Sequence, residues 1–462
     1  MALVGLMGMV AALPGIWMRA TYGAQTSGDE PHYLLTAISL AEDGSLDLRD
    51  EFLAERYRPF HEIRLSPQGA TLEDERIVSP HDPLLPALLA LPWELGGWQG
   101  AKLLLVTMNA ALGALLVWTA VRRFGSRVAV AAAVCGLFVA SAPLAVYGTQ
   151  VYPELPAALA VLAGVAAATG RTSRGSVLAV VVMVVALPWL AVKYVPVAAA
   201  VAGYALVRWW RGGERRLVVG AVVALGAAAV AFLWTHIAWY GGVTPYATSD
   251  FFAERGGQFS VAGSSPDVLG RSRRLIGLLV DDQFGLASWQ PAYLLTVPAF
   301  AALLRHRPQR WLAVVLPFGA GWLTATFVAL TMQGWWFPGR QVVVVLPLAV
   351  LAVTWLAGRG RVWLWSTVGA GILGVLTWAW LAFEGLEQRL TLIVDFASTS
   401  NPIHQAWQVV LPNYLEITAL TWILQGLWLV ALGLLAVVAW RGASPSPDRI
   451  RHSSRTRDMT RV

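Results

Sequence analysis

Two short polar stretches stand out in this chain as able to do chemistry. The first is the acidic pair Asp29-Glu30, which is followed by Pro31, His32 and Tyr33. A carboxylate held at a water–lipid boundary can act as a general base for an attacking hydroxyl group. The alternative is structural, because an acidic residue followed by Pro is also well suited to begin a helix. We therefore treat Asp29 as a candidate base and keep helix capping open.

The second stretch, Ser79-Pro80-His81-Asp82-Pro83, closes the same polar segment of the chain. The two motifs together resemble the GT-C superfamily of integral membrane glycosyltransferases, which use polyprenyl-phosphate-linked sugars. The likeness is greatest to the protein O-mannosyltransferase and aminoarabinose-transferase branch. In that branch an Asp-Glu pair follows the first span, and a His-Pro-Pro-Leu or Lys-Pro-Pro-Leu stretch closes the loop. Here Asp82 replaces the family's first Pro.

The resemblance covers about the first 240 residues, and three weaker segments, 187–194, 281–286 and 335–340, also resemble members of the superfamily. It implies an inverting transfer in which a base activates the acceptor hydroxyl and cations bind the departing lipid phosphate. Asp29 would be the base, and Glu30 would position the acceptor. The candidates for binding the donor phosphate are Lys193, Arg340, His81, Arg271, Arg273 and Arg274.

Each of these cations also has a simpler explanation. Lys193, one of only two Lys in the chain, could snorkel to the headgroups. Arg340 could belong to an ordinary aromatic belt, and the Arg cluster could bind lipid headgroups. Glu154 and Tyr147 could line the same cavity as these cations, or they could cap helices. The candidates for binding acceptor or sugar are His32, Tyr33, Asp281, Asp282, Trp335 and Trp336. We expect no resident metal or other cofactor, and leave a divalent-metal dependence open.

The composition identifies the setting of these residues. Of 462 residues, 57% are hydrophobic and 13% are charged, whereas soluble domains carry about 25% charged residues. Apolar runs such as 101–121, 217–240 and 312–332 are long enough to cross a membrane, which takes ~20 residues. These features exclude a soluble enzyme and an outer-membrane barrel. The lone Cys135 lies in an apolar run and excludes a disulfide framework. We predict an all-α polytopic membrane protein with about 12 transmembrane helices and a GT-C-like architecture.

The charges predict the orientation. More than half of the 34 Lys and Arg residues fall in five turns and the tail, where the only acids are Glu214, Asp448 and Asp458. Basic loops stay in the cytoplasm, so both termini are expected inside and the acidic motifs outside. The net charge of +7 therefore sets topology and attracts anionic lipid, and we expect no nucleic-acid partner.

The elements follow from this topology. A first span near residues 3–18 leads to a first outer loop, 19–82, which holds nearly half of the 27 acids and is expected to form amphipathic helices. Residues 83–97 are predicted to form an interfacial or re-entrant helix, and residues 241–283 a second outer loop. Residues 1–440 thus form a single transmembrane catalytic domain. Residues 441–462 are expected to be a disordered basic cytoplasmic tail.

The expected function is an inverting glycosyltransferase of the bacterial cytoplasmic membrane. It would move a sugar from a polyprenyl-phosphate donor to a glycan, lipid or protein acceptor on the outer face. The alternatives are a polytopic lipid or solute transporter or flippase, and a non-catalytic partner in a cell-envelope complex. The absence of a repeat of the first half in the second argues against a transporter built from inverted repeats.

Overall fold

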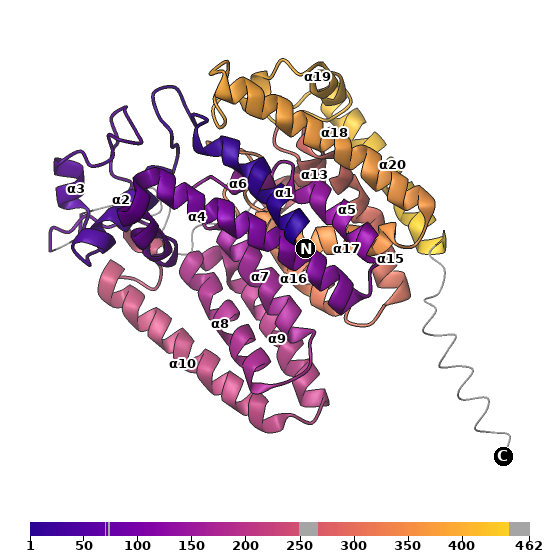
Figure 1. The fold of residues 1–462 in the computed structure, drawn as a ribbon, viewed down its shortest axis with the longest axis horizontal. Coiled ribbons are helices and arrows are strands. Elements are labelled where there is room, and N and C mark those ends of the chain that lie inside the picture. The colour runs from indigo at the N-terminus through magenta and orange to yellow at the C-terminus, as the bar shows by residue number, and fades with distance from the viewer. Residues whose placement is uncertain (70, 73, 249–266, 443–462) are drawn as a thin grey trace.

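The computed structural model of the protein describes residues 1–69, 71–72, 74–248 and 267–442. Over these residues the regular structure is helical, and β-pairing is confined to isolated bridges such as that between Ala24 and His61. Figure 1 shows the helices α7, α8, α9 and α10 side by side at one side of the molecule, with α18 and α20 at the other. The predicted all-α fold is therefore confirmed.

The first predicted span forms α1 (Ala2–Ala12), which the 3₁₀ turn η1 (Leu13–Ile16) extends. It packs against α4 (Leu84–Phe124) through small residues. A Cβ atom on Gly5 would lie 2.9 Å from the Ala110 carbonyl oxygen, and one on Gly113 would lie 3.0 Å from that of Val4. Close backbone approach of this kind is how helices associate in membranes, where burial of apolar surface gives little driving force.

The first loop folds around α2 (Glu30–Glu42) and α3 (Arg49–Leu53), at the left of Figure 1. Pro31 occupies the first turn of α2, where its missing N–H costs nothing. Leu34, Leu35 and Ile38 are fully buried, but the polar His32, Thr36 and Ser39 are buried as well, so this stretch lacks the exposed polar face expected of an amphipathic helix. The chain leaves the helix before Gly44, which has a left-handed φ of 64°.

The long helix α4 is two helical segments joined at a kink. Gly96 and Gly97 have non-helical angles, and Gly97 has a φ of 60°, which favours glycine. The predicted helix over residues 83–97 therefore exists and ends at these glycines. Its interfacial position stays a prediction.

A series of helices and short 3₁₀ turns follows α4 along the chain. They are α5 (Val128–Val139), α6 (Leu144–Tyr147), α7 (Glu154–Ala168), α8 (Arg174–Leu190), the 3₁₀ turn η2 (Val192–Tyr194), α9 (Val195–Arg211), α10 (Arg215–Tyr240) and the 3₁₀ turn η3 (Pro245–Thr248). Lys193 thus lies between the two short apolar helices α8 and α9. Ser173 begins α8 with a reciprocal capping box to Ser176.

The second half of the chain is more interrupted. Its elements are α12 (Val268–Ser272), α13 (Arg274–Val280), α14 (Leu286–Trp289), η5 (Pro291–Leu295), α15 (Thr296–His306), α16 (Leu312–Leu323), the π-helical turn η6 (Thr324–Val328), η7 (Val343–Val345), α17 (Leu346–Ala357), α18 (Arg361–Leu386), η8 (Phe396–Ser398), α19 (Pro402–Gln408) and α20 (Ala419–Gly442). The apolar segment 284–304 does not form one continuous helix, because Gln290 is extended and Pro291 begins a new turn.

Four described helical segments are long and apolar enough to cross a membrane, namely 84–124, 215–248, 361–386 and 419–442. Six shorter apolar helical segments accompany them. This is a membrane protein, and the count of about 12 crossings stays a prediction. Much of the predicted second outer loop and almost all of the predicted tail lie outside the described residues.

Arginines from three of the predicted basic turns meet at one end of the bundle. The Arg123 guanidinium donates to the Ala166 carbonyl at 2.9 Å, and Arg310 donates to the Arg123 carbonyl at 2.7 Å. Arg208 donates to the carbonyls of Ala168 and Gly170, at 2.8 and 2.6 Å. These contacts join the ends of α4, α7 and α9. The acidic motifs of the first loop lie among the opposite helix ends.

Candidate active site

Asp29 occupies the N-cap position of α2, but its side chain makes no capping hydrogen bond. Its carboxylate turns instead to Arg340, with Oδ2 2.5 Å from the guanidinium Nη2. Gln68 donates more weakly to Oδ1, at 3.4 Å. Burial opposes ionisation, but the Arg340 guanidinium outweighs it and holds the pKa of Asp29 well below its usual range. The capping role left open by the sequence is not realised here.

Arg340 belongs to a cluster of two cations and two carboxylates. Its Nε donates to Glu154 Oε1 at 3.2 Å, and the Lys193 Nζ donates to the same oxygen at 2.7 Å. Glu154 is completely buried, whereas a quarter of the Asp29 side chain is exposed. Formally the four charges cancel, which allows them to lie together in a buried site.

Local structure brings these four residues from distant segments. Asp29 precedes α2, Glu154 begins α7, Lys193 lies in η2 between α8 and α9, and Arg340 follows a turn at Gly339. Gly339 has a φ of 87°, and a Cβ there would approach Leu286 to 2.9 Å. The turn therefore requires glycine both for its backbone angle and for space.

Aromatic rings surround the Arg340 guanidinium. It lies 4.0 Å from the centroid of the Tyr152 ring and 5.0 Å from that of Trp336. The Tyr147 hydroxyl donates to the Phe337 carbonyl at 2.6 Å and fixes the segment that carries Arg340. These contacts orient the guanidinium by cation–π attraction. Trp335, by contrast, is two-thirds exposed.

Glu30 is buried, and its carboxylate accepts hydrogen bonds from two backbone N–H groups. Its Oε2 accepts from the Ser27 N–H at 2.9 Å, and its Oε1 from the Val151 N–H at 2.8 Å. These bonds fasten the start of α2 to the segment before α7, and so bring Asp29 near Glu154. The structure thus gives Glu30 a positioning contact to the backbone.

His81 lies beside the cluster. Its ring stacks on Tyr33 with 4.5 Å between centroids, and its Nε2 lies 3.0 Å from Gln68 Oε1. Burial lowers the pKa of His81, which favours the neutral ring. His32 is also buried, and burial lowers its pKa to about 3. Of the predicted residues, Asp29, Lys193, Arg340, His81, Tyr33 and Trp336 are therefore brought together.

Asp82, the residue that departs from the family motif, makes two buried hydrogen bonds. Its Oδ2 accepts from the Val192 N–H at 3.1 Å, and its Oδ1 lies 3.2 Å from Nε2 of His236 on α10. Burial raises the pKa of Asp82. The end of the first loop is thereby fastened to η2, the turn that carries Lys193.

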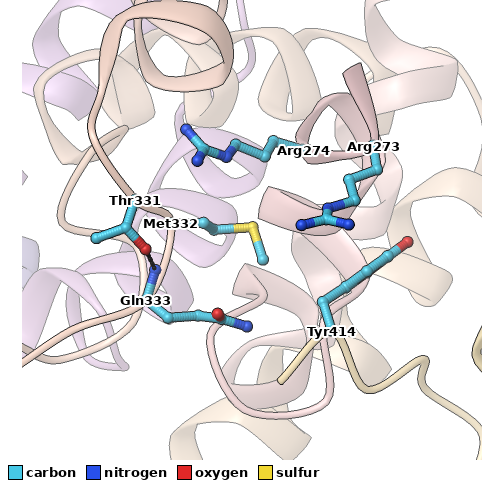
Figure 2. Close-up of a pocket in the computed structure, with 6 residues that line it drawn as sticks. All are labelled: Arg273, Arg274, Thr331, Met332, Gln333 and Tyr414. Carbon is cyan, nitrogen blue, oxygen red and sulfur yellow. Dashed lines mark hydrogen bonds between the residues drawn. The ribbon is translucent and has the colours of Figure 1, made fainter. Parts of the chain in front are cut away.

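The three clustered arginines lie elsewhere. Arg271 donates to the Phe327 carbonyl at 2.6 Å, and Arg274 donates to the carbonyls of Ala329 and Leu330. Arg273 and Arg274 line a separate pocket on one side of Met332, with Gln333 on the other (Figure 2). No described contact joins these arginines to Asp29 or Glu154.

Asp281 and Asp282 lie next to this pocket's walls. Asp281 is buried and accepts from the N–H groups of Phe284 and Tyr414, so it holds main chain. Burial raises its pKa to about 6. Burial, with the neighbouring Asp281, raises the pKa of Asp282 to about 7. Neither carboxylate contacts the Asp29 cluster in the described residues.

One group of three acids in the described residues has a spacing suited to a cation. Ligand atoms of Asp43, Asp50 and Glu51 lie within 4.8 Å of one another, around the end of α2 and the start of α3. None of them belongs to the Asp29 cluster. The expectation of no resident metal stays a prediction, and a divalent-metal dependence stays open.

Glu154 is central to the cluster, whereas the sequence left open whether it lines the cavity or caps a helix. An acid beside Tyr152-Pro153 at the start of an apolar helix is equally typical of a helix cap. The clue in the sequence was that Glu154 is a lone carboxylate at the start of an apolar helix. Such a carboxylate requires a cationic partner in a membrane. Tyr152 and Gln68 had no comparable signal.

Comparison with known proteins adds to this geometry. No protein-family model matches the chain, and no curated protein matches it in sequence. A solved structure of ArnT from Cupriavidus metallidurans bound to undecaprenyl phosphate is similar, with a TM-score of 0.51 and 17% identity over 95% of this chain and 72% of that one. The apo state of ArnT gives a TM-score of 0.49 and 18% identity, over 94% and 72% of the two chains.

The first of these alignments spans nearly the whole chain. At 17% identity it shows the fold alone. It confirms, at that level, the resemblance inferred from the two polar motifs. The chain is therefore a helical membrane protein whose fold is similar to that of ArnT.

Proposed function

We propose that this protein is an inverting glycosyltransferase that takes a sugar from a polyprenyl-phosphate donor. The observation that carries the proposal is the Asp29–Arg340–Glu154–Lys193 cluster. It combines a partly exposed carboxylate with two cations in one buried site. These are the groups that the reaction requires, namely a base for the acceptor and cations for the leaving phosphate.

The arrangement of the two cations supports a phosphate site. Lys193 and Arg340 both contact Glu154 Oε1, so their nitrogens are no farther apart than the two contact distances added together. A phosphate group can span two cations held this closely. Arg340 presents a planar fork of donors, and Lys193 a compact charge. Glu154 keeps them together while the site holds no anion.

The same cluster links donor binding to the base. With Arg340 paired to Asp29, the carboxylate is a weak base, because its pKa is held down. A donor phosphate that takes Arg340 would release Asp29 and restore its basicity. Asp29 could then accept the proton of the acceptor hydroxyl as that oxygen attacks the anomeric carbon. The bond between the sugar and the phosphate breaks, and Arg340 and Lys193 balance the negative charge of the departing lipid phosphate.

The structural neighbour supports the donor class. ArnT, which shares the fold, was solved with undecaprenyl phosphate bound. The uneven distribution of basic turns supports placing the cluster on the outer face of a bacterial cytoplasmic membrane, since the basic ends would stay inside. The acceptor would be a glycan, lipid or protein that presents a hydroxyl group there.

The test is binding of undecaprenyl phosphate to the protein in nanodiscs. We expect Lys193→Ala and Arg340→Ala each to weaken binding about tenfold or more, because a charge-assisted contact contributes ~1.5–3 kcal/mol. Melting curves report any loss of folding. Arg389→Ala is the control, since Arg389 is exposed and lies outside the cluster. If both cluster variants bind like the parent, the phosphate site lies elsewhere, and Arg273 and Arg274 become the next candidates.

A further inference from the structure

Asp82 and His236 form a buried pair that the chemistry proposed above does not use. Both side chains are almost fully buried, at 3% and 0% exposed. They join the end of the first loop to α10, which are far apart in the sequence. An ionisable pair in this setting requires an explanation, because an unpaired buried charge is costly.

The hydrogen bonds define how the pair works. His236 Nδ1 lies 2.8 Å from the Phe232 carbonyl oxygen, which can only accept, so Nδ1 carries a proton. Nε2 therefore faces the Asp82 carboxyl group across 3.2 Å with a second proton between them. That proton fixes Asp82 Oδ1 on His236 and leaves Oδ2 to accept from the Val192 N–H at 3.1 Å.

Val192 directly precedes Lys193 in the short turn η2. The helix α8 ends at Leu190, and Ala191 is extended, so the main chain changes direction here. The Lys193 Nζ must nevertheless reach Glu154 at 2.7 Å, with the Tyr194 ring 5.3 Å away. A side chain that holds the Val192 N–H restrains the backbone from which Lys193 extends.

We propose that Asp82 and His236 are positioning residues that aim Lys193 at Glu154 and at the donor phosphate. The phosphate part of this inference rests on the proposed function, whereas the aiming of Lys193 does not. The family motif that this segment resembles has Pro where Asp82 stands, and a Pro side chain cannot accept a hydrogen bond.

Two substitutions separate geometry from charge. Asp82→Asn can keep both bonds, since its amide oxygen accepts from Val192 and its amide N–H donates to a neutral His236. Asp82→Leu has similar size and can make neither bond. Glu384→Leu is the matched control, because Glu384 is also a buried carboxylate that holds a main-chain N–H, that of Ser400 at 2.9 Å.

The first readout is the reactivity of the lysines, of which the chain has only Lys102 and Lys193. Acetylation by an amine-reactive reagent is followed by mass spectrometry on the protein in nanodiscs. We expect Asp82→Leu to raise the rate at Lys193 about fivefold or more, because an amine released from its hydrogen bond to Glu154 is more accessible to the reagent. Asp82→Asn and Glu384→Leu should leave it near the parental value. Lys102, which is buried and donates to the Gln25 carbonyl, reports that the fold is intact.

The second readout is the affinity for undecaprenyl phosphate. We expect Asp82→Leu to weaken it about tenfold, that is by about 1.4 kcal/mol. In a Lys193→Met background the same change should have almost no effect, since the residue that it aims is gone. If Asp82→Leu does not fold, His236→Phe removes the shared proton and should raise the Lys193 reactivity in the same direction.

The outcomes distinguish the two proposals. Unchanged Lys193 reactivity in both Asp82→Leu and His236→Phe would overturn the positioning role. An Asp82→Asn protein that behaves like Asp82→Leu would also overturn it, because the charge would then matter and the bonds would not. If reactivity rises as expected but Lys193→Met binds lipid phosphate like the parent, the positioning role stands and the phosphate role of Lys193 fails.

Discussion

Replacing Asp29 by Asn tests the proposed base most directly. The two side chains have the same shape, and both can cap a helix. In the structure, however, Asp29 makes no capping bond and pairs with Arg340 at 2.5 Å. Asn keeps an oxygen that can accept from the guanidinium, but it loses the charge and the ability to take a proton.

The structure sets the size of the two effects. The ion pair is mostly buried, with a tenth of Arg340 and a quarter of Asp29 exposed. A hydrogen bond between charged groups contributes ~1.5–3 kcal/mol and a neutral one ~0.5–1.5 kcal/mol, so Asp29→Asn should lose about 1–1.5 kcal/mol of stability. Loss of a general base should lower the rate by ~10² to 10⁴. The effect on the rate is thus expected to exceed the effect on folding.

The assay is single-turnover consumption of a radiolabelled polyprenyl-phosphate sugar by the protein in nanodiscs. A panel of sugars is first screened on the parent protein. Single-turnover conditions separate the chemical step from product release. Asp29→Glu should lie between the parent and Asp29→Asn, since a carboxylate displaced by about 1 Å can cost ~10² in rate.

The pH dependence of stability provides a second measurement. Because the folded-state pKa of Asp29 is lowered, its ion pair stabilises the protein above the unfolded pKa of about 3.9. That contribution is lost as the pH falls toward the folded-state pKa. The parent should therefore be more stable than Asp29→Asn at neutral pH, and the difference should shrink below about pH 4.

An Asp29→Asn protein that transfers sugar at the parental rate would refute the assignment of the base. Glu154, whose Oε2 has no partner in the described residues, would be examined next.

Two further predictions concern the cations and the topology. Glu154→Gln should lower the melting temperature of the lipid-free protein, because Lys193 and Arg340 lose their shared counterion, yet it should raise the affinity for undecaprenyl phosphate about tenfold; lower affinity would show that Glu154 orients the cations rather than substituting for the anion. In a Cys135→Ser background, a cysteine at Ser45 should react with an impermeant maleimide on spheroplasts and one at Ser444 should not. The reverse pattern would place the first loop in the cytoplasm.

The sequence predicted the helical class and the main polar motifs because both depend on local pattern. Apolar runs and basic turns act over single segments, so their consequences could be derived without knowing which helices pack together. Asp29 could be identified for the same reason, because it is an acid close to Pro31 at the start of a helix. Its pairing with Arg340, more than three hundred residues away, depends on tertiary packing that no local pattern encodes.

The interpretation of Asp82 shows the same limit. In sequence it was only a departure from a motif, whereas its role depends on His236 and Val192, which two other elements supply. The break in the helix near Gln290 could not be predicted, because hydropathy does not show where a helix ends within an apolar segment. The Gln290 side-chain amide donates to the Ser141 hydroxyl at 2.6 Å. This hydrogen bond offsets the free-energy cost of burying the amide, which hydropathy alone does not take into account.

The arginines at the basic end of the bundle have a consequence for how such a chain is made. Lysine would serve equally well to retain a loop in the cytoplasm during insertion. Only a guanidinium offers the planar fork with which Arg208 reaches the Ala168 and Gly170 carbonyls together. In the predicted orientation, the same residues would first retain a loop in the cytoplasm during synthesis and later secure the assembled helix ends. An Arg-to-Lys exchange there would separate these two stages, leaving insertion unchanged while loosening the finished bundle.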